Sequence, residues 1–291
     1  VQTCALPISR LDRDLSTLRG LSFASERVVM SSQRKVVNWA SAICMGLFAA
    51  GCIIFPPKIH YNSYMMPTEL PEDTESYRTD EDGSVSYVAE GLRVSVDYLT
   101  DAELNALLPE DSGRGEYSTN PYTYGDDIEG DVGYVPNRFT VFRVSVFNQT
   151  YAKVEFDPLD VVLITDQGET KHAYGIPSTS PHSSFERYYR GIRGQSGNEF
   201  YRFEVRMGHV RSLGYAEDQP IFKGENYSGL IAFDALDSEV KKVRFALPEF
   251  ALKFDEFGAV IDAIDCQFDF DRHIEKWTVE DTQVSTDSRQ P

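Results

Sequence analysis

Residues 139–147 read Phe-Thr-Val-Phe-Arg-Val-Ser-Val-Phe, the strongest strand pattern in this chain of 291 residues. Six large apolar side chains occupy both faces of this stretch, as is typical of a central strand that is covered on both sides. Asn148 and Thr150 follow as turn residues. The stretch therefore predicts a strand in the middle of a buried β-sheet.

Short apolar segments separated by turn residues surround this strand. Val85 to Val96 alternates polar and apolar residues, with a bulge or bend expected at Gly91. Asp166-Gln167-Gly168 predicts a hairpin-like turn before a return strand at 171–174. Further strands are expected at residues 154–156, 159–164, 230–233, 243–247, 250–254 and 259–270. Their number and spacing predict a mainly β protein, an antiparallel β-sandwich with one or two short helices.

The helices are expected between strands. Thr100 and Glu103 form a capping box, and Pro109 ends the short helix that follows. Residues 198–211 fit helical and strand spacing alike, but their length, Asn198 as a cap and the glycine at position 214 favour a helix. Residues 110–137 show little periodicity and predict a long loop.

The order of these elements resembles the immunoglobulin-like domains of bacterial envelope lipoproteins. The shared features are a long first strand, an aromatic strand ending in Asn148, a strand ending in Asp-x-Gly at 166–168, and Gly-Leu-Ile-x-Phe at 229–233. The resemblance covers residues 85–270 and implies an immunoglobulin-like sandwich. The Cys, Trp, Cys signature of antibody domains is absent from the sequence.

An export signal precedes this region. Arg34 and Lys35 are followed by an apolar run, Val36 to Phe48, and then by Ala49, Ala50, Gly51 and Cys52, the order of a secretory signal with a small-residue cleavage site. Cys52 after that site resembles the lipobox of bacterial lipoproteins, which implies acylation of its sulfur and a mature N-terminus at that residue. The alternative is an uncleaved single-pass helix, since Val36 to Phe55 is long enough to span a bilayer.

The remaining segments complete the expected organisation. Residues 1–8 resemble a translated sequencing adapter, and residues 1–29 are interpreted as an artefact or an upstream translation. The signal covers residues 30–51, and residues 52–83, rich in Pro, Asp and Glu, predict an extended tether. The sandwich is expected at 84–270, and a polar, frayed tail at 271–291.

The predicted mature chain is strongly acidic. Without residues 1–51 it keeps 22 basic and 43 acidic residues, a formal charge of −21 over 240 residues. Such a charge argues against nucleic acid as a partner, because phosphate backbones need clustered Lys and Arg. Cys52 and Cys266 are then the remaining cysteines. Cys266 alternates with Ile264, Phe268 and Phe270 on one side of a strand, which predicts a buried thiol.

Chemical motifs are scarce. The sequence contains no Gly-x-Ser-x-Gly elbow, phosphate-binding loop or His-Glu-x-x-His. His182 and Glu186 have helical spacing but lack a third metal ligand, so they are interpreted as surface residues. A calcium site is conceivable in the acidic loop at Asp126, Asp127, Glu129 and Asp131. Tyrosines at 117, 122, 124, 188 and 189 indicate either a binding surface or packed loops.

These observations predict a non-catalytic, lipid-anchored protein of the cell envelope that acts as a binding or structural module without a cofactor. The expected partners are the membrane, through the anchor, and a protein of the envelope. Lipoproteins that stay in the inner membrane tend to have Asp directly after the lipidated cysteine, whereas this chain has Ile53. The resemblance therefore implies the outer membrane, where the source has one. The alternative is an envelope hydrolase with paired carboxylates. Two carboxyl groups that face each other in a cleft, one of them with a raised pKa, would favour this alternative.

Overall fold

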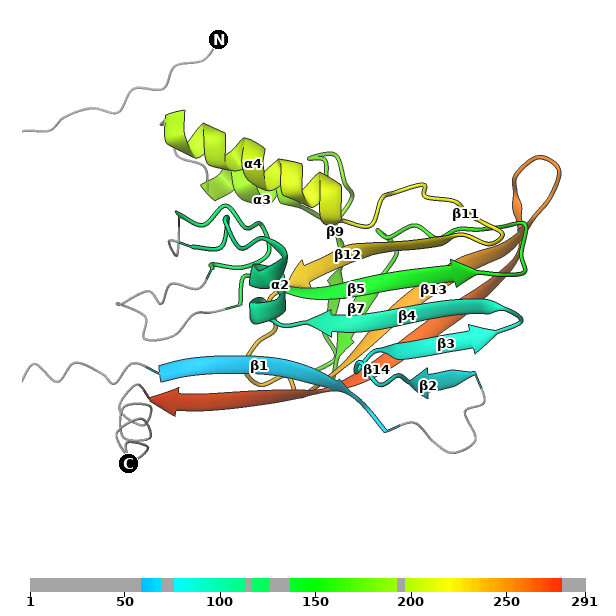
Figure 1. Cartoon of the computed structure of the whole chain (residues 1–291), viewed down its shortest axis with the longest axis horizontal. Coiled ribbons are helices and arrows are strands. Elements are labelled where there is room, and N and C mark those ends of the chain that lie inside the picture. The colour runs from blue at the N-terminus through cyan, green and yellow to red at the C-terminus, as the bar shows by residue number, and fades with distance from the viewer. Residues whose placement is uncertain (1–58, 70–75, 114–116, 126–136, 193–196, 279–291) are drawn as a thin grey trace, which may run out of the picture. The chain divides into compact units, whose positions relative to one another are not determined.

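The computed structural model describes residues 59–69, 76–113, 117–125, 137–192 and 197–278 (Figure 1). The chain divides into two units, residues 1–55 and 56–291, and all described residues belong to the second. That unit is mainly β, with two five-stranded antiparallel sheets. The expected fold class is confirmed at this level.

Sheet A contains, in spatial order, β1 (Ile59–Pro67), β14 (Val260–Thr278), β13 (Lys242–Phe254), β7 (Val162–Thr165) and β8 (Thr170–His172). Sheet B contains β12 (Asn226–Asp234), β5 (Phe139–Asn148), β4 (Leu92–Leu99), β3 (Val85–Ala89) and β2 (Tyr77–Thr79). Two short pairs lie outside these sheets: β6 (Lys153–Val154) with β11 (Ile221–Phe222), antiparallel, and β9 (Tyr174–Gly175) with β10 (Ser183–Ser184), parallel.

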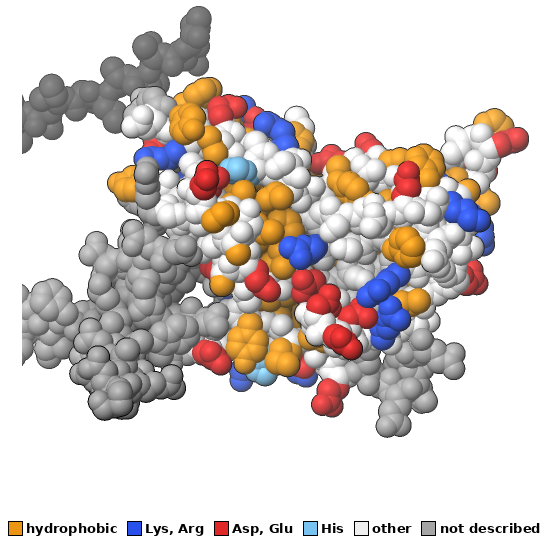
Figure 2. Space-filling model, in the orientation of Figure 1, with side chains coloured by type: hydrophobic (Ala, Val, Ile, Leu, Met, Phe, Trp, Pro, Cys, Tyr) orange, Lys and Arg blue, Asp and Glu red, His pale blue; other side chains and the backbone are white. Residues whose placement is uncertain are grey.

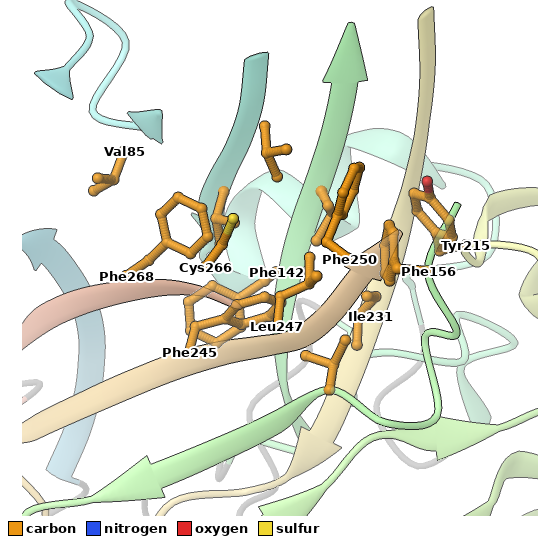
Figure 3. Packing of buried hydrophobic residues seen from close by; sticks show 14 of the residues in the cluster. Val85, Phe142, Phe156, Tyr215, Ile231, Phe245, Leu247, Phe250, Cys266 and Phe268 are labelled. Atoms are coloured by element: carbon orange, nitrogen blue, oxygen red, sulfur yellow. The ribbon is translucent and has the colours of Figure 1, made fainter. Parts of the chain in front are cut away.

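One core fills the space between the two sheets. Phe142 of β5 lies 5.1 Å from Phe245 of β13, measured between ring centroids, and both side chains are fully buried. Figure 3 shows that Cys266 points into the same core beside Phe268. The thiol is free and fully buried, as predicted. Val243, Phe245 and Leu247 also face this core, and the strand expected at 243–247 is present as part of β13.

The central position of β5 is confirmed, because it pairs with β4 on one side and β12 on the other. Its first four residues are all buried, whereas Arg143, Ser145 and Phe147 on its outer face are at least partly exposed. The prediction that both faces are covered therefore holds for only half of the strand.

Three helices lie in the described part of the chain: α2 (Asp101–Leu107), α3 (Phe185–Ile192) and α4 (Gly197–Leu213). The capping box of α2 is present as predicted, with Thr100 and Glu103 bonded to each other's backbone N–H groups. The helical interpretation of 198–211 is also confirmed, although Asn198 lies inside α4 and does not cap it. The sequence did not predict α3, so the expected one or two helices were too few.

A second apolar cluster lies against the outer face of sheet B. Phe139 and Val141 of β5 and Leu99 of β4 pack there with Met207 and Val210 of α4. Phe185 and Tyr189 of α3 belong to the same cluster. The helices therefore cover one half of this outer face and leave the other half open.

Three sequence interpretations are corrected. Val85 to Val96 is a hairpin, β3 and β4, and Glu90 and Gly91 form its turn with φ of 49° and 80°. The predicted tether contains β1 and β2, which are paired within the sheets. The predicted tail begins too early, since β14 continues to Thr278 and its last nine residues pair with β1. The pairing of β1 with β14 joins remote parts of the chain, whereas β2, β3 and β4 pair with their neighbours in sequence.

Candidate functional site

A row of serines crosses the open half of the outer face of sheet B. Ser95 of β4 pairs with Ser86 of β3 and with Ser145 of β5, and Ser145 pairs with Ser228 of β12. Alternate residues of a strand point to opposite faces. Because Val94, Val96, Val144 and Val146 point into the core, the serines between them point outward.

The small side chains of this row leave a depression. The pocket has a volume of about 420 Å³, which is within the range of small-molecule binding sites. Its lining comprises Asp82, Ser84, Arg93, Ser95, Asp97, Arg143, Ser145, Val146, Phe147, Asn226, Tyr227 and Ser228. At its floor, the hydroxyls of Ser145 and Ser228 are 3.0 Å apart. The hydroxyl of Ser95 lies 2.7 Å from that of Ser86, which is buried and does not line the pocket. We call this site the serine pocket.

Two further rows form the sides of the serine pocket. Arg93, Phe147 and Asn226 are aligned across β4, β5 and β12 on one side of the serines. Asp97 and Arg143 are aligned on the other side, next to the half of the sheet that the helices cover. The register of three strands therefore places one aromatic ring, one amide and three charged side chains around a hydroxyl-lined floor.

Arg93 is held in place by a carboxylate. Its Nη2 lies 2.6 Å from Asp80 Oδ2, and its Nε donates to the hydroxyls of Ser86 and Ser95 at 3.2 Å. Burial acts to raise the pKa of Asp80, but hydrogen bonds from Ser86 and Arg93 hold that pKa below its usual value. The Asp80 carboxylate is therefore ionised at neutral pH and offsets the charge of Arg93.

Asp97 and Asp82 differ in their surroundings. Burial raises the pKa of Asp97 to about 6, and Arg143, 3.9 Å away, offsets this only in part. Hydrogen bonds from the side chain and the backbone N–H of Ser84 lower the pKa of Asp82. The serine pocket thus contains one carboxyl group that is easily protonated and one that stays ionised.

Figure 2 shows acidic and basic side chains intermingled with uncharged surface over β3, β4 and β5. A second pocket, of about 300 Å³, lies against sheet A, where Thr68, Asp166, Arg244 and Asp269 contribute to its lining. Arg244 and Asp269 are joined there by two hydrogen bonds, of 2.7 and 3.0 Å. The serine pocket is the larger of the two and combines hydroxyl, amide and charged groups with an aromatic ring, so it is the stronger candidate.

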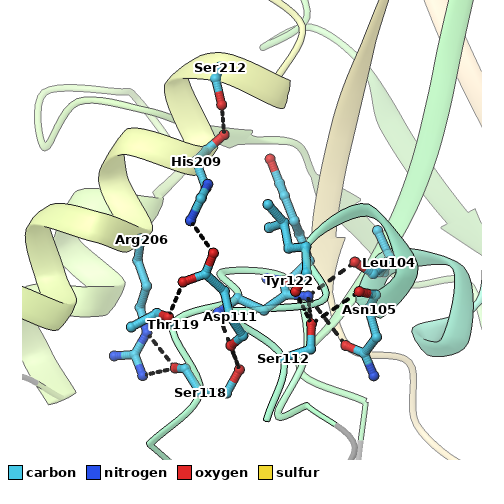
Figure 4. Close-up of polar contacts among 12 residues, drawn as sticks. Leu104, Asn105, Asp111, Ser112, Ser118, Thr119, Tyr122, Arg206, His209 and Ser212 are labelled. Atoms are coloured by element: carbon cyan, nitrogen blue, oxygen red, sulfur yellow. Dashed lines mark hydrogen bonds and ion pairs between the residues drawn. The ribbon is translucent and has the colours of Figure 1, made fainter.

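A polar network links α4 to the loop after α2 (Figure 4). His209 Nε2 of α4 lies 2.9 Å from Asp111 Oδ2, and the guanidinium of Arg206 donates to the carbonyl of Ser118. Asn120 bonds the carbonyl of Leu104 at 3.1 Å. Most of these bonds satisfy backbone groups of an irregular segment, so the network is interpreted as structural.

The tyrosines that the sequence offered as a binding surface are mostly packed. Tyr122 and Tyr189 are each 1% exposed and belong to the apolar cluster beneath α3 and α4. The guanidinium of Arg138 lies 4.1 Å from the ring centroid of Tyr124. For these residues the alternative of packed loops is the better description.

The lipidation, calcium and histidine candidates of the sequence are not among the described residues that line the serine pocket. Cys52, the cleavage residues Ala49, Ala50 and Gly51, and the calcium candidates Asp126, Asp127, Glu129 and Asp131 lie outside the described residues. His182 precedes α3 and stacks on His172 at 3.6 Å, whereas Glu186 of α3 accepts from the Ser178 N–H at 2.6 Å. The two therefore do not share a helical face. In the described ranges, no three His, Cys, Asp or Glu side chains come close enough together to hold a metal ion.

No family model, curated protein or solved structure shows a significant match to this chain. Among the described residues, none of the helices has the length and apolarity needed to cross a membrane. The sequence analysis did not predict the serine pocket, although Ser95 and Ser145 each stand between two valines of an alternating strand and could have suggested a polar face. The alignment of the serine row depends on the register of four strands, which a single sequence does not give.

Proposed function

We propose that this protein is a non-catalytic, lipid-anchored binding module of the cell envelope whose ligand occupies the serine pocket. The observation that carries the binding role is a polar pocket of about 420 Å³ on a rigid sheet, with convergent hydroxyl, amide and charged groups. The anchor is supported by the signal pattern before Cys52. The residue after it, Ile53, favours the outer membrane where the source has one.

Replacement of the predicted anchor tests the location. We expect Cys52→Ser to abolish incorporation of labelled fatty acid in a bacterial host and to release the protein from the membrane fraction. Cys266→Ser is the matched control, because Cys266 is the other cysteine after the predicted cleavage site. Membrane association that survives Cys52→Ser without bound lipid would support the single-pass helix instead.

The immunoglobulin-like form of the sandwich is also part of the proposal. It is supported by two antiparallel sheets facing each other across one core. The chain passes from sheet B to sheet A between β5 and β7 and again between β12 and β13, as Greek-key connections do. An experimental structure with a different strand connectivity would reject this part without affecting the binding role.

A hydrolase is the second candidate, and one observation favours it. Asp97 and Asp82 line the same pocket, and their pKa values are shifted in opposite directions, as expected of an acid and a second carboxylate in glycoside cleavage. Against it, Asp82 is committed to the turn at Ser84 through two hydrogen bonds. Release of new reducing ends from a polysaccharide, lost in Asp97→Asn, would establish the enzyme and reject the non-catalytic role.

A further inference from the structure

We propose that the serine pocket binds a neutral carbohydrate, a short oligosaccharide that lies across the strands of sheet B along the serine row. This inference rests on the proposed binding function and adds the chemical class of the ligand. It is carried by three features of the site: the hydroxyl floor, the balance of charge, and one exposed aromatic ring.

The floor of the pocket matches the chemistry of a sugar. A serine hydroxyl is a donor and an acceptor at once and can rotate to suit its partner, and sugar hydroxyls have the same property. Ser95 and Ser145 occupy the middle of the row and are partly exposed, and Ser228 at its end is exposed. Ser86 at the other end is buried and does not line the pocket. The accessible part of the row therefore crosses three strands, which is about 10 Å at the usual spacing between strands. Such a floor accommodates a short oligosaccharide.

The charges of the pocket are balanced within the protein. Its lining contains two arginines and two aspartates. Arg93 is already paired with Asp80 at 2.6 Å, and Arg143 faces Asp97 at 3.9 Å. A strongly anionic ligand would have to displace Asp80 or Asp97 from its arginine, which leaves a partly buried charge unpaired. A neutral ligand can accept hydrogen bonds from the arginines and donate to the carboxylates without disturbing either pair.

The remaining requirement is an apolar surface for the face of a sugar ring. Phe147 lines the pocket and is 38% exposed, between Arg93 and Asn226 in its row. An aromatic ring flanked by an amide and a guanidinium offers stacking and directional hydrogen bonds together. Because Phe147 lies on a paired central strand, its position is fixed before the ligand binds.

The experiment is a binding titration of the full chain with defined oligosaccharides. The probes are neutral gluco-, manno-, galacto- and N-acetylglucosamine oligomers, with sulfated oligomers of the same backbones as the anionic set. We expect at least one neutral series to bind, with affinity rising with chain length until the serine row is filled. The sulfated counterpart should bind at least tenfold more weakly.

Ser145→Leu is the site variant, because the added side chain fills the middle of the row. We expect Ser145→Leu to weaken binding of the neutral oligomer at least tenfold. Ser228→Leu, at an exposed position, should also weaken binding. Ala246→Leu is the matched control. Ala246 lies on the outer face of sheet A between the buried Phe245 and Leu247, and the change should alter affinity less than twofold.

A second panel separates failure of the ligand class from failure of the binding role. It consists of free amino acids and unmodified dipeptides, followed by ligand-observed NMR on the wild type and on Ser145→Leu. Binding from this panel alone, lost in Ser145→Leu, would overturn the carbohydrate and retain the binding pocket. Tighter binding of sulfated oligomers, or neutral binding that Ser145→Leu does not change, would also overturn the inference. Absence of binding in both panels would overturn the proposed function as well.

Discussion

Replacing Asp97 by asparagine is expected to change how the stability of this protein depends on pH. The Asp97 side chain is 29% exposed, and its ion-pair partner, Arg143, is 3.9 Å away. Burial raises the pKa of the Asp97 carboxyl group from 3.8 to about 6. The folded state therefore binds this proton more tightly than the unfolded chain does. The contribution of Asp97 to stability is complete below about pH 4 and is lost as the pH rises through about 6.

The size of the effect follows from the two pKa values. A change from 3.8 to about 6 corresponds to about 3 kcal/mol, which is an upper limit because the carboxyl group keeps some contact with water. Asparagine does not titrate. We therefore expect the free energy of unfolding of Asp97→Asn to rise relative to that of the wild type by about 1 to 3 kcal/mol between about pH 4 and about pH 7.

Urea unfolding followed by far-UV circular dichroism at several pH values measures this difference. Asp97→Glu is the control, because it keeps an ionisable carboxyl group at the same place. Its free energy of unfolding should therefore still fall as the pH rises. If Asp97→Asn and the wild type change in parallel over the whole range, Asp97 is not the group whose pKa the fold raises. The acid role of Asp97 in the hydrolase alternative would then lose its physical basis.

Other predictions test the core and the backbone. Phe142→Ala should lower the free energy of unfolding by about 3 to 5 kcal/mol in urea titrations, because this fully buried ring packs between the sheets. A decrease of less than about 1 kcal/mol would contradict a common core between the sheets. Gly229→Ala should destabilise more than Gly113→Ala, because the Cβ at position 229 would lie 2.4 Å from Tyr215 Cα, whereas nothing lies within 4 Å at position 113. Equal melting temperatures would be inconsistent with this packing. Burial raises the pKa of Cys266 to about 12, so in a variant without the other cysteines its thiol should resist a disulfide exchange reagent until urea is added.

Local signals in the sequence predicted local structure well. The capping box at Thr100 and Glu103 and the helix over most of 197–213 depend on residues a few positions apart, and both are present. Strand β5 was recognised because its apolar residues are continuous. Its open end was not recognised, because exposure of Arg143, Ser145 and Phe147 depends on where the helices lie.

The failures concern pairings between remote parts of the chain. Residues 59–67 and 270–278 contain polar residues that individually suggest exposed segments, but the two segments pair with each other as antiparallel strands. Main-chain hydrogen bonds stabilise such a pair whatever the side chains are. The serine pocket shares this dependence, since the serines of its floor come from three separate strands and only their register brings them together.

The position of β1 changes what the proposed anchor implies. The expected tether of residues 52–83 would have allowed the sandwich to move far from the membrane. Since β1 begins at Ile59, the chain between Cys52 and the first strand can span at most about 25 Å even when fully extended. A lipid on Cys52 would thus keep the start of β1 close to the bilayer surface. If Cys52 carries a lipid, a connection of this length would restrict the sheet to ligands and partners near the anchoring membrane. The carbohydrate proposed for the serine pocket would then be envelope carbohydrate at that surface.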